Sequence, residues 1–82
     1  MLIAVVPNQA KQENVDLTRE VAQRLSKLGV DVRVVCAEHS LPTAVQLAEA
    51  LKGCDKVVAI GGDGTIMHVG KAAGALHLPV LG

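Results

Sequence analysis

A short loop in the last third of the chain carries the residues best suited to chemistry. In "VVAIGGDGTIMHVG", residues 57–70, an aliphatic run gives way to Gly-Gly-Asp-Gly-Thr and then resumes as a helical pattern. Glycines at the end of a strand let a ligand approach the backbone, and the N-terminus of the next helix favours a phosphate. The sequence therefore predicts a phosphate-binding loop made of Gly61, Gly62, Gly64 and Thr65.

The carboxylate of Asp63 lies in the middle of this loop. It would repel a bare phosphate, so it has a use if it takes a proton from a hydroxyl group or if a divalent cation lies between it and the phosphate. Both uses indicate phosphoryl transfer. Asp-Gly is also a common turn pair, and Asp or Thr often caps a helix. The spacing matches neither the P-loop nor the Gly-x-Gly-x-x-Gly fingerprint, so the residues alone leave both interpretations open.

Aliphatic runs and amphipathic segments alternate along the chain and must position this loop. Continuous apolar runs predict strands at residues 2–6, 30–36, 56–60 and 79–81. Helical spacing predicts three helices, from Asp16 to Leu28, from Ser40 or Pro42 to Leu51, and from Thr65 to about Leu76. No hairpin signal interrupts the alternation, so we expect right-handed crossovers and an open, doubly wound α/β fold, Rossmann-like or flavodoxin-like, with a parallel sheet.

Turn residues define the expected ends of these elements. Asp16 or Asn14 is expected to cap the first helix, and the polar segment "NQAKQEN" before it is expected to be a surface loop. Glycines at positions 29 and 53 are expected to end the first two helices. In a sheet of this kind, ligands bind beyond the carboxyl ends of the strands. The glycine loop is therefore expected at the binding edge.

Composition narrows the class of protein. Half of the 82 residues are hydrophobic but none is aromatic, so the core must be aliphatic. Eight basic residues balance eight acidic ones, which argues against nucleic acid or an anionic membrane as a partner. No apolar run is long enough to span a membrane, and the start lacks the features of a signal peptide. We therefore expect a cytoplasmic protein.

The two cysteines do not form a metal-binding pattern. Cys36 and Cys54 each flank an expected strand and lack a Cys-x-x-Cys arrangement. Both are expected to be buried as small hydrophobic residues. No metal ligand is therefore assigned within the chain.

The stretch "GGDGTIMH" resembles the signature of NAD kinases. The segments "IAVVPN", "LGVDVRVV" and "LPVLG" extend this resemblance to the N-terminal part of that family. Diacylglycerol and sphingosine kinases share the Gly-Gly-Asp-Gly-Thr core, but they usually continue with Asn-Glu where this chain has Met67-His68. Phosphofructokinases share it more loosely and usually carry a glycine-rich loop after the first strand, where this chain has "VVPNQAKQ".

The resemblance implies a reaction and a set of roles. Asp63 would take the proton from the 2′-hydroxyl of the NAD adenosine ribose, and Asp63, Gly64 and His68 would contact NAD. ATP or polyphosphate would donate the phosphoryl group with a divalent metal cation, usually Mg²⁺, and the product would be NADP. The resemblance also implies that the complete enzyme is a homo-oligomer.

The resemblance covers only part of such an enzyme. NAD kinases carry a second, β-rich domain that holds much of the NAD site, and no segment of residues 1–82 corresponds to it. We therefore expect residues 1–82 to be the N-terminal α/β nucleotide-binding domain and to be inactive alone. A piece of a lipid kinase and a non-catalytic flavodoxin-like module are the alternatives.

Other polar residues have simpler explanations. Without the resemblance, His68 would be a surface or capping histidine. His39 is expected to be solvated, His77 to lie at the end of a helix, and Lys71 to be a solvated charge. Asn8 follows the first strand at the binding edge, where it would either line the nucleotide cleft or complete a turn.

Overall fold

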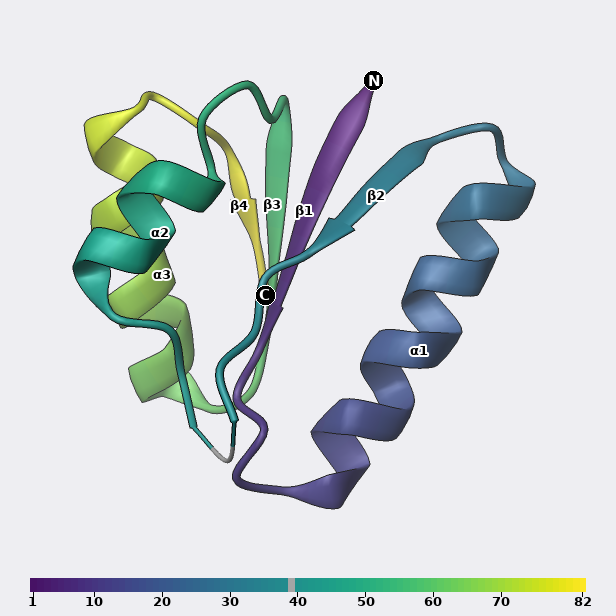
Figure 1. Ribbon diagram of the computed structural model, residues 1–82, viewed down its shortest axis with the longest axis horizontal. Coiled ribbons are helices and arrows are strands. Elements are labelled where there is room, and N and C mark those ends of the chain that lie inside the picture. The colour runs from purple at the N-terminus through teal and green to yellow at the C-terminus, as the bar shows by residue number, and fades with distance from the viewer. Residues whose placement is uncertain (39) are drawn as a thin grey trace.

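The computed structural model describes residues 1–38 and 40–82, so the prediction for His39 lies outside the described residues. Strands and helices alternate along the whole chain, as expected (Figure 1). The strands are β1 (Leu2–Pro7), β2 (Asp31–Val34), β3 (Lys56–Ile60) and β4 (Val80–Leu81), and the helices are α1 (Gln12–Lys27), α2 (Ala44–Ala50) and α3 (Asp63–Ala75).

All four strands are parallel and lie in the order β2-β1-β3-β4. Val5 in β1 is aligned with Val34 in β2 on one side and with Val58 in β3 on the other. The central place of β1 explains its continuous apolar sequence, because a strand with neighbours on both sides and helices above and below has no solvent-facing residues. The predicted parallel α/β sheet is confirmed.

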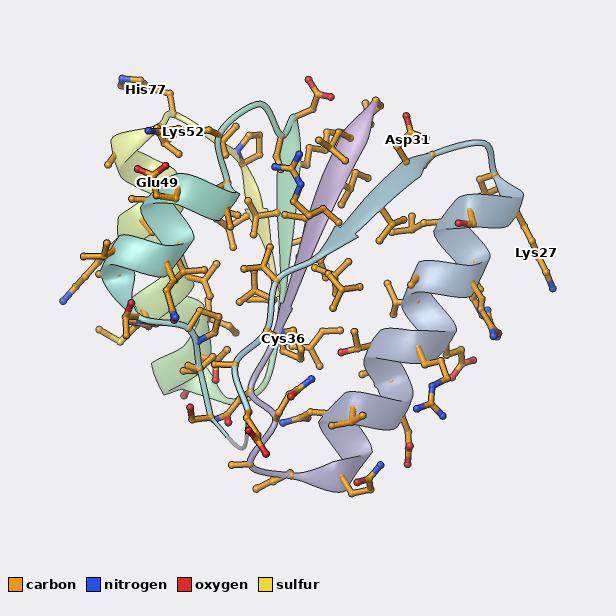
Figure 2. The ribbon with its side chains drawn as sticks, in the orientation of Figure 1. Lys27, Asp31, Cys36, Glu49, Lys52 and His77 are labelled. Atoms are coloured by element: carbon orange, nitrogen blue, oxygen red, sulfur yellow. The ribbon has the colours of Figure 1, made fainter. Side chains whose placement is uncertain are left out.

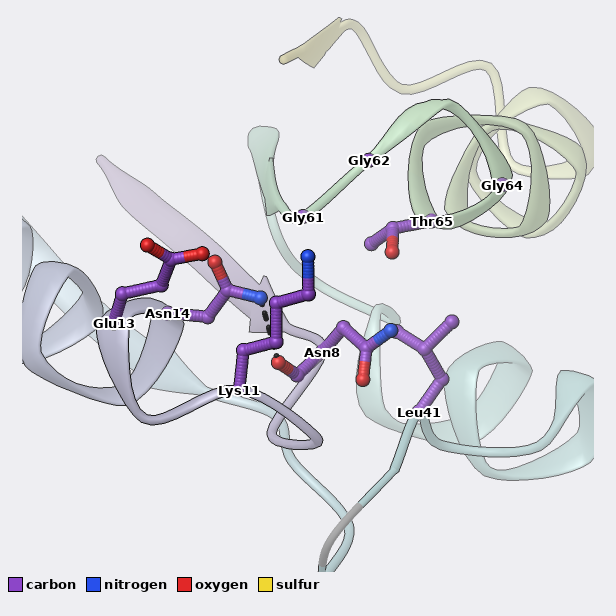
Figure 3. A pocket seen from close by; sticks show the side chains of 9 residues that line it. All are labelled: Asn8, Lys11, Glu13, Asn14, Leu41, Gly61, Gly62, Gly64 and Thr65. Atoms are coloured by element: carbon purple, nitrogen blue, oxygen red, sulfur yellow. Dashed lines mark hydrogen bonds between the residues drawn. The ribbon is translucent and has the colours of Figure 1, made fainter.

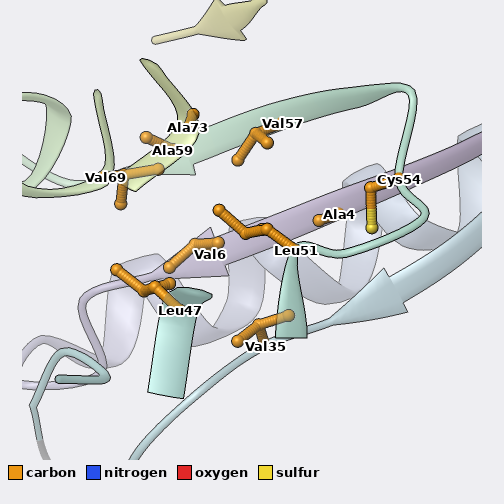
Figure 4. Close-up of a cluster of buried hydrophobic side chains, with 10 residues drawn as sticks. All are labelled: Ala4, Val6, Val35, Leu47, Leu51, Cys54, Val57, Ala59, Val69 and Ala73. Atoms are coloured by element: carbon orange, nitrogen blue, oxygen red, sulfur yellow. The ribbon is translucent and has the colours of Figure 1, made fainter. Parts of the chain in front are cut away.

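Helices cover both faces of the sheet. Helix α1 lies on one side, and α2 and α3 lie together on the other (Figure 1). The side of α2 and α3 holds an aliphatic core with one thiol, made of Ala4, Val6, Val35, Leu47, Leu51, Cys54, Val57, Ala59, Val69 and Ala73 (Figure 4). Ile3, Val5 and Ile60 are buried on the side of α1. Each buried Val, Leu or Ile side chain contributes about 1.5–3 kcal/mol, so the fold is stabilised without aromatic residues.

The first helix begins earlier than the sequence indicates. Helix α1 starts at Gln12 with Lys11 as its N-cap, so the caps predicted at Asn14 and Asp16 are wrong. Asn14 lies inside the helix and donates its side-chain amide to the backbone oxygen of Asn8 at 2.9 Å. The surface loop expected at residues 8–14 is correspondingly shorter. The reason is that the first turn of α1 is polar all round, so apolar spacing appears only later in the helix.

The second helix is capped by Thr43, and Ser40 and Pro42 lie before it. The Thr43 hydroxyl accepts from the Gln46 N–H at 3.2 Å, and the Gln46 side chain accepts from the Thr43 N–H at 2.9 Å. This reciprocal capping box satisfies two donors at once. The helix start predicted at Ser40 or Pro42 is therefore too early.

The structure confirms the predicted helix ends and the predicted burial of one of the two cysteines. Gly29 and Gly53 follow α1 and α2 with φ of 80° and 82°, as expected of residues that end helices. Cys54 is buried as predicted, whereas Cys36 is exposed because β2 ends at Val34, two residues before it. Among the described residues, no helix is both long and apolar enough to cross a membrane.

Candidate active site

The strand order creates a crevice between β1 and β3. After β1 the chain passes to α1 on one face of the sheet, and after β3 it passes to α3 on the opposite face (Figure 1). Two loops that leave neighbouring parallel strands in opposite directions separate at the carboxyl edge, which is where ligands bind in open α/β sheets. The glycine loop therefore faces the segment after β1.

An open cleft of about 690 Å³ lies at this position. Its volume is within the range of about 300–1,000 Å³ that is typical of small-molecule sites. Residues from three segments line it, namely Asn8, Lys11, Glu13 and Asn14 after β1, Leu41 before α2, and Gly61, Gly62, Gly64 and Thr65 after β3 (Figure 3). The predicted phosphate loop thus forms one wall of the cleft.

Close packing against Thr65 explains why position 61 is a glycine. A Cβ atom at Gly61 would lie 2.9 Å from the Thr65 Cβ, and Thr65 is only 3% exposed. Gly62 caps α3 without a side chain, and its carbonyl accepts from the N–H groups of Thr65 and Ile66 at 3.0 and 3.2 Å. Because no side chain occupies the cap, the first amides of α3 are available to an anion in the cleft.

Asp63 is the first residue of α3, between two glycines that line the cleft. Its side chain is exposed, and it is not among the residues that line the cleft, although its neighbours Gly62 and Gly64 are. A carboxylate in the first turn of a helix is stabilised by the helix dipole. Because Asp63 is exposed next to two lining glycines, its carboxylate is accessible to a substrate group that enters beside a phosphate held by the loop.

His68 contacts another part of the protein. Its Nε2 atom lies 2.8 Å from the backbone oxygen of Pro42, and the ring is half-buried. His68 follows Asp63 by five residues, which places the two about 140° apart around the helix axis. His68 is not a lining residue of the cleft, but Pro42 adjoins Leu41, which is one. The structure therefore connects His68 to the cleft through this wall segment.

Asn8 fulfils both expectations. It lines the cleft, and its side-chain oxygen accepts from the Ala10 N–H at 3.0 Å, which makes a turn. Its own N–H donates to the Ile60 oxygen at 2.8 Å, so the end of β1 is held against the end of β3. The two walls of the cleft are therefore positioned by direct backbone pairing.

Sequence reasoning missed Lys11, which extends from the β1 side toward the glycine loop (Figure 3). A usable signal was present, because Lys11 lies four residues after the end of β1 and just before a helix. Among the described lining residues, Lys11 carries the only positive charge and Glu13 the only negative one. Lys71 is exposed on α3, as predicted, and the exposed His77 follows that helix with φ of 58°.

No cluster of three or more His, Cys, Asp or Glu residues suited to a metal ion occurs within residues 1–38 and 40–82. Mg²⁺ usually keeps several waters and binds through one or two carboxylates together with substrate phosphates. Glu13, which lines the cleft, and Asp63, which lies between two lining glycines, are carboxylates that fit that mode of binding.

Comparisons with known proteins show the family to which the chain belongs. The protein family described as the diacylglycerol kinase catalytic domain matches residues 1–81 of this chain. The chain is also similar to the NAD kinase of Corynebacterium jeikeium, with 32% identity over 91 positions that cover 98% of this chain and 28% of that protein.

Two further relatives extend the similarity. The NAD kinase of Nocardia farcinica is 36% identical over 80 positions, which cover 98% of this chain and 22% of that protein. The NAD kinase of Corynebacterium glutamicum is 40% identical over 72 positions, which cover 74% of this chain and 25% of that protein. The chain therefore spans about a quarter of the length of these relatives, and the resemblance to NAD kinases is confirmed.

Proposed function

Because the chain belongs to the diacylglycerol kinase catalytic domain family and is similar along its length to NAD kinases, we propose that it forms the phosphoryl-transfer half of an NAD kinase site. The observation that carries the proposal is the cleft at the ends of β1 and β3, with a glycine-capped helix on one wall and the exposed Asp63 between two glycines of that wall. In this role, residues 1–82 correspond to the N-terminal α/β domain of the enzyme, and the NAD site is completed by a β-rich domain.

The proposed reaction uses the two features differently. The amides at the start of α3 hold the terminal phosphates of ATP or polyphosphate, and the exposed carboxylate of Asp63 faces the 2′-hydroxyl of the NAD adenosine ribose. The hydroxyl oxygen forms a bond to the terminal phosphorus, the bond from that phosphorus to the bridging oxygen breaks and releases ADP or the shortened polyphosphate, and Asp63 accepts the hydroxyl proton. NADP and, with ATP as donor, ADP are the products.

Positioning is the main contribution of the remaining residues. Gly64 lets the substrate approach the first turn of α3, and Thr65 supports the loop from below through its packing under Gly61. His68 is assigned to NAD on the side of the Pro42 segment. A divalent cation would neutralise charge on the phosphates, and Glu13 and Asp63 are the residues of this chain that would hold it.

A chimeric enzyme tests the proposal. The segment of the Corynebacterium jeikeium NAD kinase that aligns with this chain is replaced by residues 1–82, and NADP formation from NAD and ATP is measured. We expect the chimera to form NADP and the Asp63→Asn chimera to lose that activity while it stays folded. A folded chimera without NADP formation would contradict the proposal. The same assay with NADH and polyphosphate defines the substrate preference.

The family description supports one alternative, a lipid kinase that phosphorylates diacylglycerol. The two functions differ in the acceptor that must reach Asp63. Titration of the labelled chain with NAD, and separately with short-chain diacylglycerol in micelles, distinguishes them. Shifts of the Asp63 and Gly64 amide signals with NAD alone favour the NAD kinase, and shifts with diacylglycerol alone favour the lipid kinase. As part of the proposed NAD kinase function, we also propose that the complete enzyme is a homo-oligomer and is located in the cytoplasm.

A further inference from the structure

The residue at the N-cap of α1 is unsuited to that position on structural grounds alone. N-caps favour Ser, Thr, Asp and Asn, whose side-chain oxygen accepts from the first turn. Lys11 occupies the N-cap of α1 and makes no side-chain cap hydrogen bond. A lysine also places a positive charge beside the positive end of the helix dipole, which is unfavourable. The free protein therefore loses stability by having a lysine here.

The Lys11 ammonium group has no balancing partner in the described structure. The ion pairs of residues 1–38 and 40–82 whose partners are both described join Arg24 to Glu20 and Lys52 to Glu49, far from the cleft. Glu13 lies beside Lys11 in the same wall but does not pair with it. The Lys11 side chain extends instead across the cleft toward Gly61 and Gly62 (Figure 3). An unpaired cation is therefore presented to the space in front of the glycine loop.

The loop that carries Lys11 is fixed before any ligand binds. Asn8 accepts from Asn14 through its backbone oxygen and from Ala10 through its side chain, at 2.9 and 3.0 Å. The Thr18 hydroxyl donates to the Asn14 backbone oxygen at 2.7 Å, which holds the first turns of α1 together. A cation on a preorganised loop loses little conformational entropy when it meets a ligand.

Two helix N-termini and one lysine thus face the same space, α1 with Lys11 from one wall and α3 with Gly62 from the other. We propose that Lys11 binds the phosphate chain of the phosphoryl donor from the wall opposite the glycine loop, so that the donor is held between the two helix N-termini. This inference rests on the proposed function for the identity of the donor. It accounts for a lysine at a position where it otherwise destabilises the helix.

The proposal is tested by titration of the isotope-labelled 82-residue chain with inorganic tripolyphosphate and, separately, with magnesium-ATP, followed through the amide signals of Gly61, Gly62 and Gly64. We expect Lys11→Met to weaken binding of both probes by at least about tenfold, which is the loss of one charge-assisted hydrogen bond. Lys11→Arg should retain binding, because it keeps the charge. Tighter binding of magnesium-ATP than of tripolyphosphate identifies a nucleotide donor, and equal binding identifies the phosphate chain alone.

Two matched variants separate binding from folding. Lys27→Met removes an exposed lysine at the other end of the same helix, roughly 24 Å away, and should bind like the unmodified chain (Figure 2). Lys11→Ser introduces a preferred N-cap, so it should raise Tm while it weakens tripolyphosphate binding. A Lys11→Ser chain that is more stable and binds less cannot owe its loss of binding to unfolding.

The outcomes distinguish this proposal from the proposed function. Equal tripolyphosphate affinity in the unmodified and Lys11→Met chains, or no binding by the unmodified chain at millimolar tripolyphosphate, overturns the role of Lys11. If the chimera forms NADP with the same KM for ATP after Lys11→Met, the role of Lys11 fails and the kinase function stands. If tripolyphosphate binds through Lys11 but the chimera forms no NADP, the phosphate site stands and the kinase function fails.

Discussion

The imidazole of His68 and the backbone carbonyl of Pro42 are joined by a 2.8 Å contact across 26 residues of sequence. The contact connects the second turn of α3 to the segment before α2, which includes the cleft residue Leu41. A carbonyl oxygen only accepts hydrogen bonds, so Nε2 must carry the proton in this contact. His68, three residues after Thr65 of the glycine loop, thus contacts the segment that forms a second wall of the cleft.

This relationship defines a prediction for His68→Ala in the chimeric enzyme. Loss of the contact should release the Pro42 segment and raise the KM for NAD more than the KM for ATP, because the glycine loop and Lys11 are untouched. The free energy of unfolding should fall by about 0.5–1.5 kcal/mol, the net value of one hydrogen bond. Steady-state kinetics with each substrate varied provide the measurement.

The control is His77→Asn, which changes an exposed histidine at the other end of α3 and keeps a residue type that tolerates its positive φ. It should leave both KM values unchanged. Equal changes in the two KM values after His68→Ala, or no change, would limit His68 to a structural role.

Asp63→Asn should remove the proton acceptor and retain the fold. We expect turnover of the chimera to fall by about 10²–10⁴-fold, as is typical for loss of a general base. Tripolyphosphate should bind at least as tightly, because a carboxylate near the phosphates has been neutralised. Rapid-quench measurement of NADP together with the amide titration checks both statements. Near-normal NADP formation by this variant would show that Asp63 is not the base.

Gly61→Ala should destabilise the loop from within. The added Cβ would be forced against the side chain of Thr65, which is buried. Overpacking of this kind costs about 1–3 kcal/mol, and each kcal/mol lowers Tm by roughly 4–8 °C in a domain of this size. Gly62→Ala is the matched control, since a Cβ there meets nothing within 4 Å. Equal Tm values for the two variants in thermal unfolding would contradict the packing argument.

The 82-residue chain by itself should be marginally stable and should form no detectable NADP from NAD and ATP. It spans about a quarter of the length of its relatives, and its edge strand β4 has only two residues, with Leu81 exposed. A small aliphatic core leaves little reserve, so we expect a free energy of unfolding below about 5 kcal/mol. Urea unfolding and an enzymatic cycling assay for NADP are the measurements, and robust NADP formation would overturn this expectation.

The local sequence pattern alone was enough to predict the order of strands and helices and the position of the glycine loop between a strand and a helix. The run Leu2–Pro7 is apolar at every position, which is typical of a strand covered on both faces. Gly29 and Gly53 follow helical patterns and have positive φ angles, a backbone conformation that favours glycine at helix ends. The Gly-Gly-Asp-Gly-Thr segment lies between a strand and a helix, so its place at the carboxyl edge of a parallel sheet followed from the alternation of elements.

Only the tertiary structure decided which residues face that loop. Periodicity within one segment says nothing about which strands are neighbours, and β1 acquires its central place from pairing with strands far away in the sequence. That pairing brings Asn8 and Lys11 opposite Gly61, and helix packing brings His68 to Pro42. These contacts join segments that are separate in the chain, and they form because the sheet buries β1 against both neighbours. For that reason the loop could be predicted from the sequence, whereas the sequence indicated only that Lys11 follows β1 and not that it faces the loop.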